Sequence, residues 1–221
     1  AGRLGDPGRG RRVILDLHGG VGEKGRTSIS CRSGATRVLI DCGINTSVRG
    51  RDYYPRIEPD VLAKTDVLVV THAHEDHIGG MGWCIENGFR GRILMTRETR
   101  EEADSCWAVY SEPRHRALAM DADIEDIEPG EEIDLGGIQL HTGRSGHVVG
   151  GIWCSLSGGG TTLNYCGDVV PHSAVLAMDP MPACDALLLD ASYGDDAVSS
   201  ADRAAAVRAW VSRHPACILP T

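Results

Sequence analysis

The chain has 221 residues, of which 42% are hydrophobic and 24% are charged, and its formal net charge is −9. This composition suits one globular domain with a sizeable core, and the acidic balance argues against general nucleic-acid coating, although it leaves room for a local basic groove. The sequence lacks the roughly 18 to 20 consecutive apolar residues that span a bilayer and the apolar segment of a signal peptide. We therefore expect a cytoplasmic protein with no membrane association.

In the N-terminal half, we predict that the first strands form the antiparallel beginning of a sheet. The first twelve residues are rich in Gly, Arg and Pro, so we expect a flexible leader over 1–12 and the folded domain over 13–221. Glycine-bearing turns separate three predicted strands at 13–17, 27–32 and 37–41. A short helix over 58–64 and a buried apolar strand over 66–70 follow.

The second half alternates helices with groups of strands. We predict a strand over 93–95 and a helix over 98–120 that is interrupted near Pro113. Further strands are predicted at 133–135, 137–141, 152–157, 161–165, 186–189 and 216–219. A last helix is predicted over 199–214, with Ser200 as its N-cap and Asp202 in its first turn. This order predicts an α/β fold of two mixed sheets between helical layers.

The eight cysteines are scattered along the chain, and none forms a C-x-x-C pair. A disulfide framework is the competing interpretation, but a chain with a core of this size does not need one. We therefore expect buried free thiols.

Four potential metal ligands lie within six residues, immediately after the predicted strand 66–70. They are His72, His74, Asp76 and His77. A loop at the end of a strand can turn these side chains toward one point, and imidazole and carboxylate groups suit zinc and similar cations. A metal site is the prediction, and a polar loop that is merely histidine-rich is the alternative.

With this cluster the chain resembles the metallo-beta-lactamase superfamily, whose signature is His-x-His-x-Asp-His after an apolar strand. Three further motifs occur in the order typical of that family: Asp41 within VLIDCG, His147 within SGH and Asp168 within CGD. The resemblance covers about residues 13–221. It implies a four-layer αββα sandwich of two mixed sheets flanked by helices.

The resemblance also implies a pair of metal ions, zinc or alternatively Mn²⁺ or Fe²⁺, that share a hydroxide nucleophile. Asp41 would orient the ligands, and Asp41 and Asp76 are candidate catalytic residues. The implied ligand set is His72, His74 and His147 for one ion, Asp76 and His77 for the other, and Asp168 between them. The remaining histidines are His18, His115, His141, His172 and His214, which are expected to be ordinary surface or core residues.

The segment Gly20-Val21-Gly22-Glu23-Lys24-Gly25 matches the G-x-G-x-x-G fingerprint of dinucleotide-binding proteins. That fingerprint requires a helix immediately afterwards, whereas an extended segment is predicted here. A glycine-rich turn like that of RNA-processing metallo-beta-lactamase relatives is the better interpretation.

Two secondary motifs resemble the beta-CASP nuclease branch, which includes ribonuclease J and the polyadenylation-factor endonuclease. The first is SGHVVGG, which contains His147. The second is LLLDASYGD, in which Asp190 matches an acidic residue that supports an active-site histidine and is a third candidate catalytic residue. The segment departs from that branch at Ala191-Ser192 and at Asp196, where a Ser-Thr pair and a basic residue are usual.

The sequence ends within the predicted strand 216–219, before the cap domain and the last metal-ligand histidine of that branch. We therefore expect the domain to be truncated at its C-terminal end, with a partner chain or a later segment completing the site. The favoured function is a metal-dependent phosphodiesterase that acts on RNA, and on single-stranded DNA as a further substrate. The alternatives are a hydrolase of a small ester, thioester or lactone and a catalytically silent assembly domain.

Overall fold

Two mixed β-sheets frame residues 13–190 of this computed structural model, which describes residues 13–192, 194 and 196–214. The first sheet has the order β1-β2-β3-β4-β5-β6; β1 to β3 pair antiparallel, and β3 to β6 pair parallel. Its strands are Val13–Gly19, Ser28–Ser33, Thr36–Ile40, Val67–Val69, Arg92–Met95 and Ile124–Asp126. Strands β1 to β5 lie where the sequence predicted strands, whereas β6 was not predicted.

The second sheet has the order β11-β10-β9-β8-β7, with a parallel pair at β10 and β11 and antiparallel pairs elsewhere. Its strands, from β7 to β11, are Glu132–Asp134, Gln139–Arg144, Ile152–Gly158, Thr161–Tyr165 and Ala186–Leu188. The predicted α/β fold with two mixed sheets is therefore confirmed.

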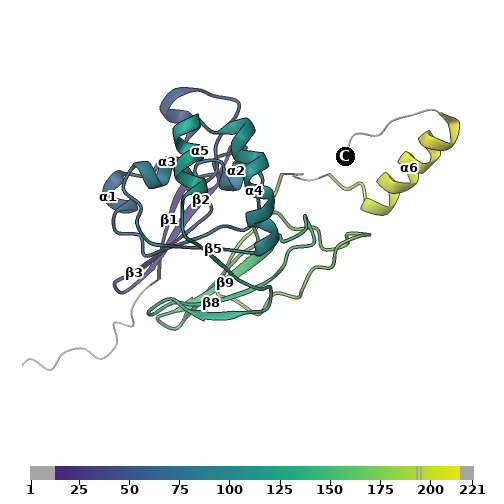
Figure 1. Ribbon diagram of the computed structural model, residues 1–221. Coiled ribbons are helices and arrows are strands. Elements are labelled where there is room, and N and C mark those ends of the chain that lie inside the picture. Colours follow the sequence, from purple (N-terminus) through teal and green to yellow (C-terminus); the bar gives the residue numbers. More distant parts are fainter. Residues whose placement is uncertain (1–12, 193, 195, 215–221) are drawn as a thin grey trace, which may run out of the picture. The chain divides into compact units, whose positions relative to one another are not determined.

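Helices cover the outer face of the first sheet (Figure 1). They are α1 (Pro59–Leu62), α2 (Glu75–Ile78), α3 (Met81–Glu86), α4 (Arg97–Tyr110) and α5 (Pro113–Met120), and a 3-10 turn η1 spans Gly50–Tyr53. The predicted break near Pro113 is confirmed, because this proline begins α5. The short helices α2 and α3 were not predicted.

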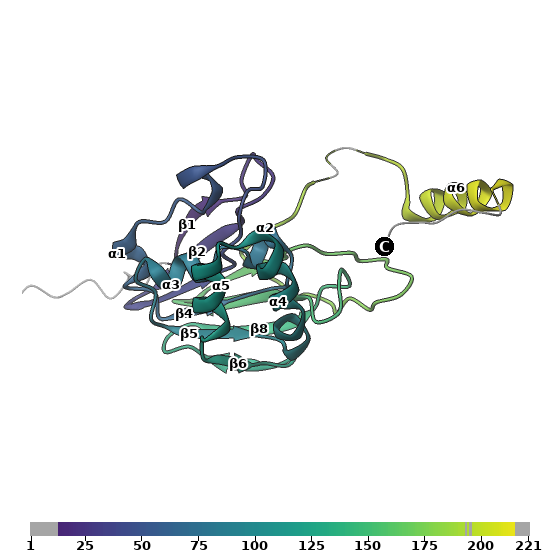
Figure 2. The ribbon, with the colours of Figure 1, turned by 45° about the horizontal axis from the view of Figure 1, so that its top comes forward.

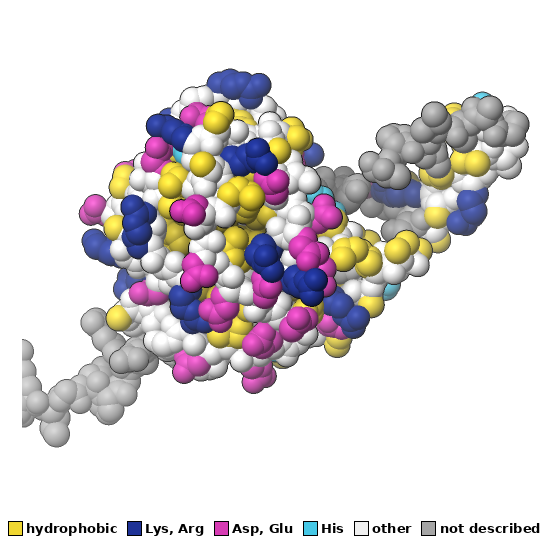
Figure 3. Space-filling model, viewed as in Figure 1, with side chains coloured by type: hydrophobic (Ala, Val, Ile, Leu, Met, Phe, Trp, Pro, Cys, Tyr) yellow, Lys and Arg dark blue, Asp and Glu magenta, His cyan; other side chains and the backbone are white. Residues whose placement is uncertain are grey.

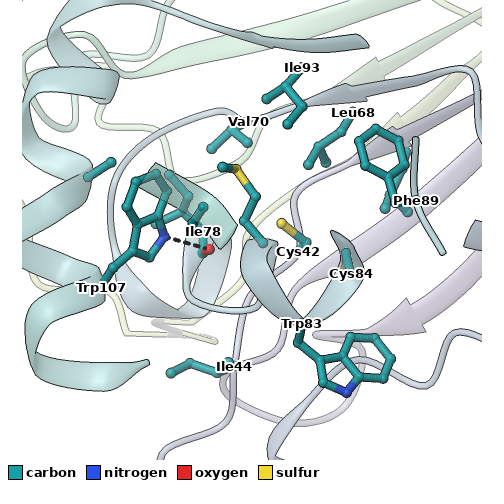
Figure 4. Packing of buried hydrophobic residues seen from close by; sticks show 14 of the residues in the cluster. Cys42, Ile44, Leu68, Val70, Ile78, Trp83, Cys84, Phe89, Ile93 and Trp107 are labelled. Carbon is teal, nitrogen blue, oxygen red and sulfur yellow. Dashed lines mark hydrogen bonds between the residues drawn. The ribbon is translucent and has the colours of Figure 1, made fainter. Parts of the chain in front are cut away.

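Two apolar cores hold these layers together. In the first, side chains of the helices pack on Leu68, Val70 and Ile93 of the sheet, and Trp107 of α4 donates a hydrogen bond to the carbonyl of Ile78 (Figure 4). The second core lies between the two sheets, where residues such as Val69 and Leu156 meet; Figure 2 shows the strands β4, β5 and β6 beside β8. Alternation along the strands thus buries both faces of the first sheet.

The described residues after 190 belong to a second unit, which contains α6 (Ser200–Arg213). The predicted N-cap at Ser200 is wrong by one residue. The side chain of Ser199 caps the helix, because its hydroxyl accepts the backbone N–H of Asp202 at 3.1 Å. The predicted leader 1–12 and the predicted strand 216–219 lie outside the described residues.

The predicted buried free thiols are confirmed at six cysteines of the described residues, whereas the free thiol of Cys184 is exposed. Cys217 lies outside the described residues. Among the described helices, none combines the length and the apolar character that crossing a membrane requires.

Candidate metal centre

The polar residues of the predicted site gather at one edge of the sandwich. Asp41 follows β3, and the segment from Thr71 to His77 follows β4. Because β3 and β4 are parallel neighbours, their carboxyl ends lie at the same edge of the sheet. The second sheet brings His147, from the β8–β9 loop, and Asp168, which follows β10, to the same place.

Four side chains point their ligand atoms at one another. These atoms, from His72, His74, His147 and Asp168, all lie within 4.8 Å of one another. His74 Nδ1 lies 3.1 Å from His72 Nε2 and 3.3 Å from His147 Nε2. Asp168 Oδ2 lies 3.9 Å from His72 Nε2 and 3.5 Å from His147 Nε2.

These separations fit a metal ion. Ligand atoms that lie about 2.0–2.1 Å from a tetrahedral zinc ion are roughly 3.3–3.4 Å from one another. Three imidazoles and one carboxylate form a donor set that such a cation accepts. The residues present therefore fit the metal that the histidine motif implies.

His77 lies between two carboxylates. Its Nδ1 is 2.8 Å from Asp41 Oδ2, and its Nε2 is 3.3 Å from Asp168 Oδ1. Asp76 and His77 belong to the short helix α2, whereas a loop was predicted for the whole cluster. The backbone of Gly43 packs closely against α2. A Cβ at this position would lie 1.7 Å from the carbonyl oxygen of Asp76, so the close packing requires glycine.

Asp41 is the centre of a buried hydrogen-bond network. Its carboxylate accepts the backbone N–H of Thr71 at 2.8 Å, the hydroxyl of Thr71 at 2.9 Å, the hydroxyl of Tyr165 at 2.8 Å and Nδ1–H of His77. Since the Thr71 hydroxyl donates to Asp41, its oxygen can accept Nδ1–H of His72 at 3.1 Å. This arrangement leaves the lone pair of His72 Nε2 facing the cluster.

Thr71 and Tyr165 were missed by the sequence analysis. Each adjoins a recognised motif, Thr71 just before His72 and Tyr165 just before the CGD segment. The signal in the sequence was therefore a polar residue beside a ligand motif. The direction in which its side chain points depends on the fold.

The electrostatics separate the roles of the histidines. Burial, together with the neighbouring imidazoles, lowers the pKa of His72 well below its usual range, so this ring is a neutral donor. Burial also opposes charge on His77, but the charge of Asp41 and the hydrogen bonds that the ring donates to Asp168 and Asp41 outweigh it and raise the pKa of His77 to about 10. Positive charge is thus favoured beside Asp168.

The loop that carries His147 is fastened to the start of α4. Thr96 Oγ1 donates to the carbonyl of Gly150 at 2.8 Å, and the hydroxyl of Thr99 lies 3.3 Å from the same oxygen. A Cβ at Gly150, where φ is +76°, would lie 2.7 Å from Thr96 Oγ1. Ile152, at the start of β9, donates its backbone N–H to the carbonyl of Thr71 and so joins the two sheets beside the cluster.

Besides Asp41 and His77, two more predicted site residues, Asp76 and Asp190, lie outside the group of four. Asp76 is half-buried in α2, and its charge contributes to raising the pKa of His77. Asp190 follows β11, and its charge acts to raise the pKa of His147, although burial makes the net shift of that pKa downward. The support of an active-site histidine by Asp190, which the second beta-CASP motif implies, stays a prediction.

A family model described as the beta-lactamase superfamily domain matches residues 36–219. Curated relatives include Ribonuclease TTHA0252 of Thermus thermophilus, which is 30% identical over 174 residues, or 74% of this chain and 40% of that protein. Cleavage and polyadenylation specificity factor 73 of Drosophila melanogaster is 27% identical over 78% of this chain and 27% of its own length. The chain thus spans less than half the length of these relatives.

Solved structures with the same fold include a metallo-beta-lactamase with a HARLDQ motif from Cronobacter sakazakii. It has a TM-score of 0.51 and 18% identity, over 68% of this chain and 56% of that one. A protein of unknown function from Enterococcus faecalis has a TM-score of 0.56 and 14% identity, over 73% of this chain and 44% of its own. Both similarities concern the fold alone.

Proposed function

We propose that this chain, which belongs to the metallo-beta-lactamase superfamily, is the catalytic domain of a metal-dependent nuclease that hydrolyses phosphodiester bonds of RNA in the cytoplasm. The observation that carries the proposal is the group of four ligand atoms of His72, His74, His147 and Asp168. Its substrate class is supported by relatives named ribonuclease and, in Candida glabrata, Endoribonuclease YSH1, at 24% identity over 80% of this chain.

The proposed metal is zinc, with two ions per site. His72, His74 and His147 would hold the first ion, Asp76 and His77 the second, and Asp168 would lie between them. The 3.3 Å contact between His77 Nε2 and Asp168 Oδ1 supports a second position beside the first. When bound, such ions lower the pKa of water toward neutrality and stabilise negative charge on a phosphate group.

The chain's own residues orient and support this centre. Asp41 accepts Nδ1–H of His77 directly and supports that of His72 through the Thr71 hydroxyl, so that both Nε2 atoms would face a bound ion. At His77 a bound ion would displace the Nε2 proton. The negative charge of Asp190 acts on the ring of His147, which is a proposed metal ligand. Asp190 is therefore proposed as a positioning residue.

The test of the metal centre is the substitution His74→Ala. His74 is exposed, so the change removes a ligand without opening a core cavity. We expect loss of bound metal and of metal-dependent hydrolysis of single-stranded RNA, with an unchanged circular dichroism spectrum. The matched control is His214→Ala, an exposed histidine outside the cluster, which should leave activity unchanged. Full activity in the His74 variant would refute the proposed centre.

Asp190→Asn tests the beta-CASP assignment separately. Removing the charge while keeping the shape should reduce the rate of RNA hydrolysis and the zinc affinity, because the proposed ligand His147 loses a neighbouring negative charge. A hydrolysis rate and a zinc affinity equal to those of the wild type would argue against this role. Hydrolysis of carboxylic esters with no action on RNA would favour the small-molecule alternative.

A further inference from the structure

A pocket separate from the metal cluster lies between the η1 loop and the ends of α4 and α5. Its volume is about 560 Å³, and its lining includes Arg49, Tyr53, Tyr110 and Arg114. Figure 3 shows Lys and Arg side chains around hydrophobic ones on this helical face of the molecule, toward the top of the view. The proposed nuclease chemistry makes no use of this pocket.

The floor of the pocket is a rigid aromatic stack. The rings of Tyr54 and Trp83 stack with centroids 5.1 Å apart and an interplanar angle of 12°, and the guanidinium of Arg51 lies 4.8 Å from the centroid of Trp83. The hydroxyl of Tyr54 is 3.1 Å from His115 Nδ1, and the other ring nitrogen of His115 is 2.9 Å from Glu86 Oε2. These bonds hold the floor in place before any ligand arrives.

The wall of the pocket offers an accessible ring. Tyr110, at the end of α4, is 37% exposed. Its backbone carbonyl accepts the hydroxyl of Tyr53 at 2.8 Å, which ties the η1 loop to α4 and sets the width of the pocket. A flat ring of a ligand can therefore stack on Tyr110 without displacing the buried stack below.

The charge of the pocket is opposite to that of the chain. Three arginines and one glutamate line it, which gives a formal charge of +2 against −9 for the whole chain. Arg49 is exposed and donates to the carbonyls of Thr46 and Val48, and within the described residues it forms no ion pair with a carboxylate. Its charge is available to an anion.

Short links join the pocket to the metal centre. The hydroxyl of Ser111, a lining residue, donates to the carbonyl of Gly79 at the end of α2, and the backbone N–H of Ile44 donates to the carbonyl of Glu75 at its start. Helix α2 carries Asp76 and His77. A single hydrogen bond from a lining residue therefore connects the pocket to the helix that carries two predicted ligands.

We propose that this pocket binds a segment of single-stranded RNA outside the cleavage position, with a base stacked on Tyr110 and a phosphate beside Arg49. Aromatic rings beside arginines are the features by which proteins bind unpaired nucleotides without reading their sequence. The proposal rests on the proposed RNA substrate. The pocket would give this acidic protein a local, positively charged binding site for a polyanion.

The test is binding of a short, fluorescently labelled RNA that has 2′-O-methyl groups and phosphorothioate linkages to resist hydrolysis, measured by anisotropy on the full chain. Tyr110→Ala should weaken binding at least about fivefold, since base stacking is lost. Arg49→Glu should weaken RNA binding about tenfold. It should also make the negative slope of log affinity against log salt concentration less steep by about 0.7, because one phosphate contact is lost.

The matched control is Lys64→Glu, the same charge reversal at a side chain that is 73% exposed and does not line the pocket; it should change affinity less than about twofold. Affinities of both pocket variants equal to that of the wild type would overturn the proposal. So would uridine monophosphate binding that depends on Tyr110 in a protein that does not bind the RNA, because the pocket would then serve a small molecule.

Failure of the nuclease proposal is read out separately. The wild type is assayed with bis(4-nitrophenyl) phosphate, a minimal phosphodiester with no flanking nucleotides. Absence of hydrolysis, combined with loss of RNA binding in the pocket variants, would remove the proposed activity and support the pocket. Hydrolysis combined with unchanged RNA binding in the pocket variants would support the proposed activity and overturn the proposed pocket.

Discussion

Asp41 combines two unusual properties in one residue. Its side chain is completely buried, and its backbone has a φ of 59°, in the left-handed region that residues other than glycine rarely adopt. Such a conformation is costly and persists where the surroundings over-determine it. Here the hydrogen bonds from Thr71, His77 and Tyr165 hold Asp41 in this conformation. They offset the backbone strain and keep the carboxylate behind the predicted metal ligands.

We predict that Asp41→Asn weakens metal binding about 10- to 100-fold. Asparagine tolerates the left-handed conformation, so the change removes the charge without adding backbone strain, and its amide NH₂ faces groups that also donate. The measurement is competition for zinc against a chelator of known affinity. Asp66→Asn is the control, because this exposed carboxylate also accepts a backbone N–H, from Arg37 at 2.8 Å. Equal zinc affinity in the Asp41 variant and the wild type would contradict the role.

The residues of the site were predictable where they sit in short motifs. His72 and His74 are two residues apart, and their types alone indicate a metal. Thr71 and Tyr165 were missed because their hydrogen bonds to Asp41 join residues 30 and 124 positions apart. The pairing of β3 with β4 brings Thr71 to Asp41, and the packing of the two sheets brings Tyr165 there. The stack of Tyr54 on Trp83 was missed because it depends on how the η1 loop packs against α3.

At the scale of elements, the start of α4 serves both the helix and the metal centre. Thr96 caps this helix by accepting the N–H of Thr99 at 3.2 Å and also donates to the carbonyl of Gly150, at the end of the loop that holds His147. A helix cap normally stabilises the helix that it begins. In this protein the same hydroxyl connects the cap to a predicted ligand.

Thr96→Ala should therefore lower the free energy of unfolding by about 1–3 kcal/mol, which combines the lost cap and the lost hydrogen bond to Gly150. It should also reduce zinc affinity, because the His147 loop loses its anchor. Urea denaturation and a zinc titration measure the two effects. Ser199→Ala removes the cap of α6 and should leave zinc affinity unchanged. A Thr96 variant that is destabilised but binds zinc normally would show that the cap acts locally.

Elements with strong patterns were predicted, and those whose existence depends on neighbours were not. The break between α4 and α5 follows from the covalent structure of Pro113. Strand β6 has only Ile124 flanked by acidic residues and forms because the edge of β5 is available for parallel pairing. At α6 two adjacent serines competed for the cap, and the position of Asp202 relative to Ser199 decided between them.

At the scale of the whole molecule, the two cores account for most of the buried thiols. Burial raises the pKa of Cys31 to about 11 and that of Cys106 to about 12. Both thiols therefore stay protonated at about pH 9, where an exposed thiol with a pKa of about 8.5 is largely ionised. Cys184 is the exposed cysteine of the described residues.

We predict that a maleimide labels Cys184 in the native protein, whereas Cys31 and Cys106 react only after unfolding, at neutral pH and at about pH 9 alike. Peptide mapping by mass spectrometry identifies each site, and it also separates Cys217. Cys184→Ser should remove the native signal at that peptide and leave the unfolding-dependent signals intact. Rapid native labelling of Cys31 would mean that the space between the sheets opens readily.

The most direct test of the proposed metal-dependent nuclease is elemental analysis of the purified chain combined with a metal-dependence assay on a 5′-labelled single-stranded RNA. The proposed site predicts about two zinc ions per chain and shortening of the RNA that stops when a chelator removes the metal and resumes when zinc returns. A chain that binds no divalent metal, or that holds zinc and leaves the RNA intact under every condition, would contradict it.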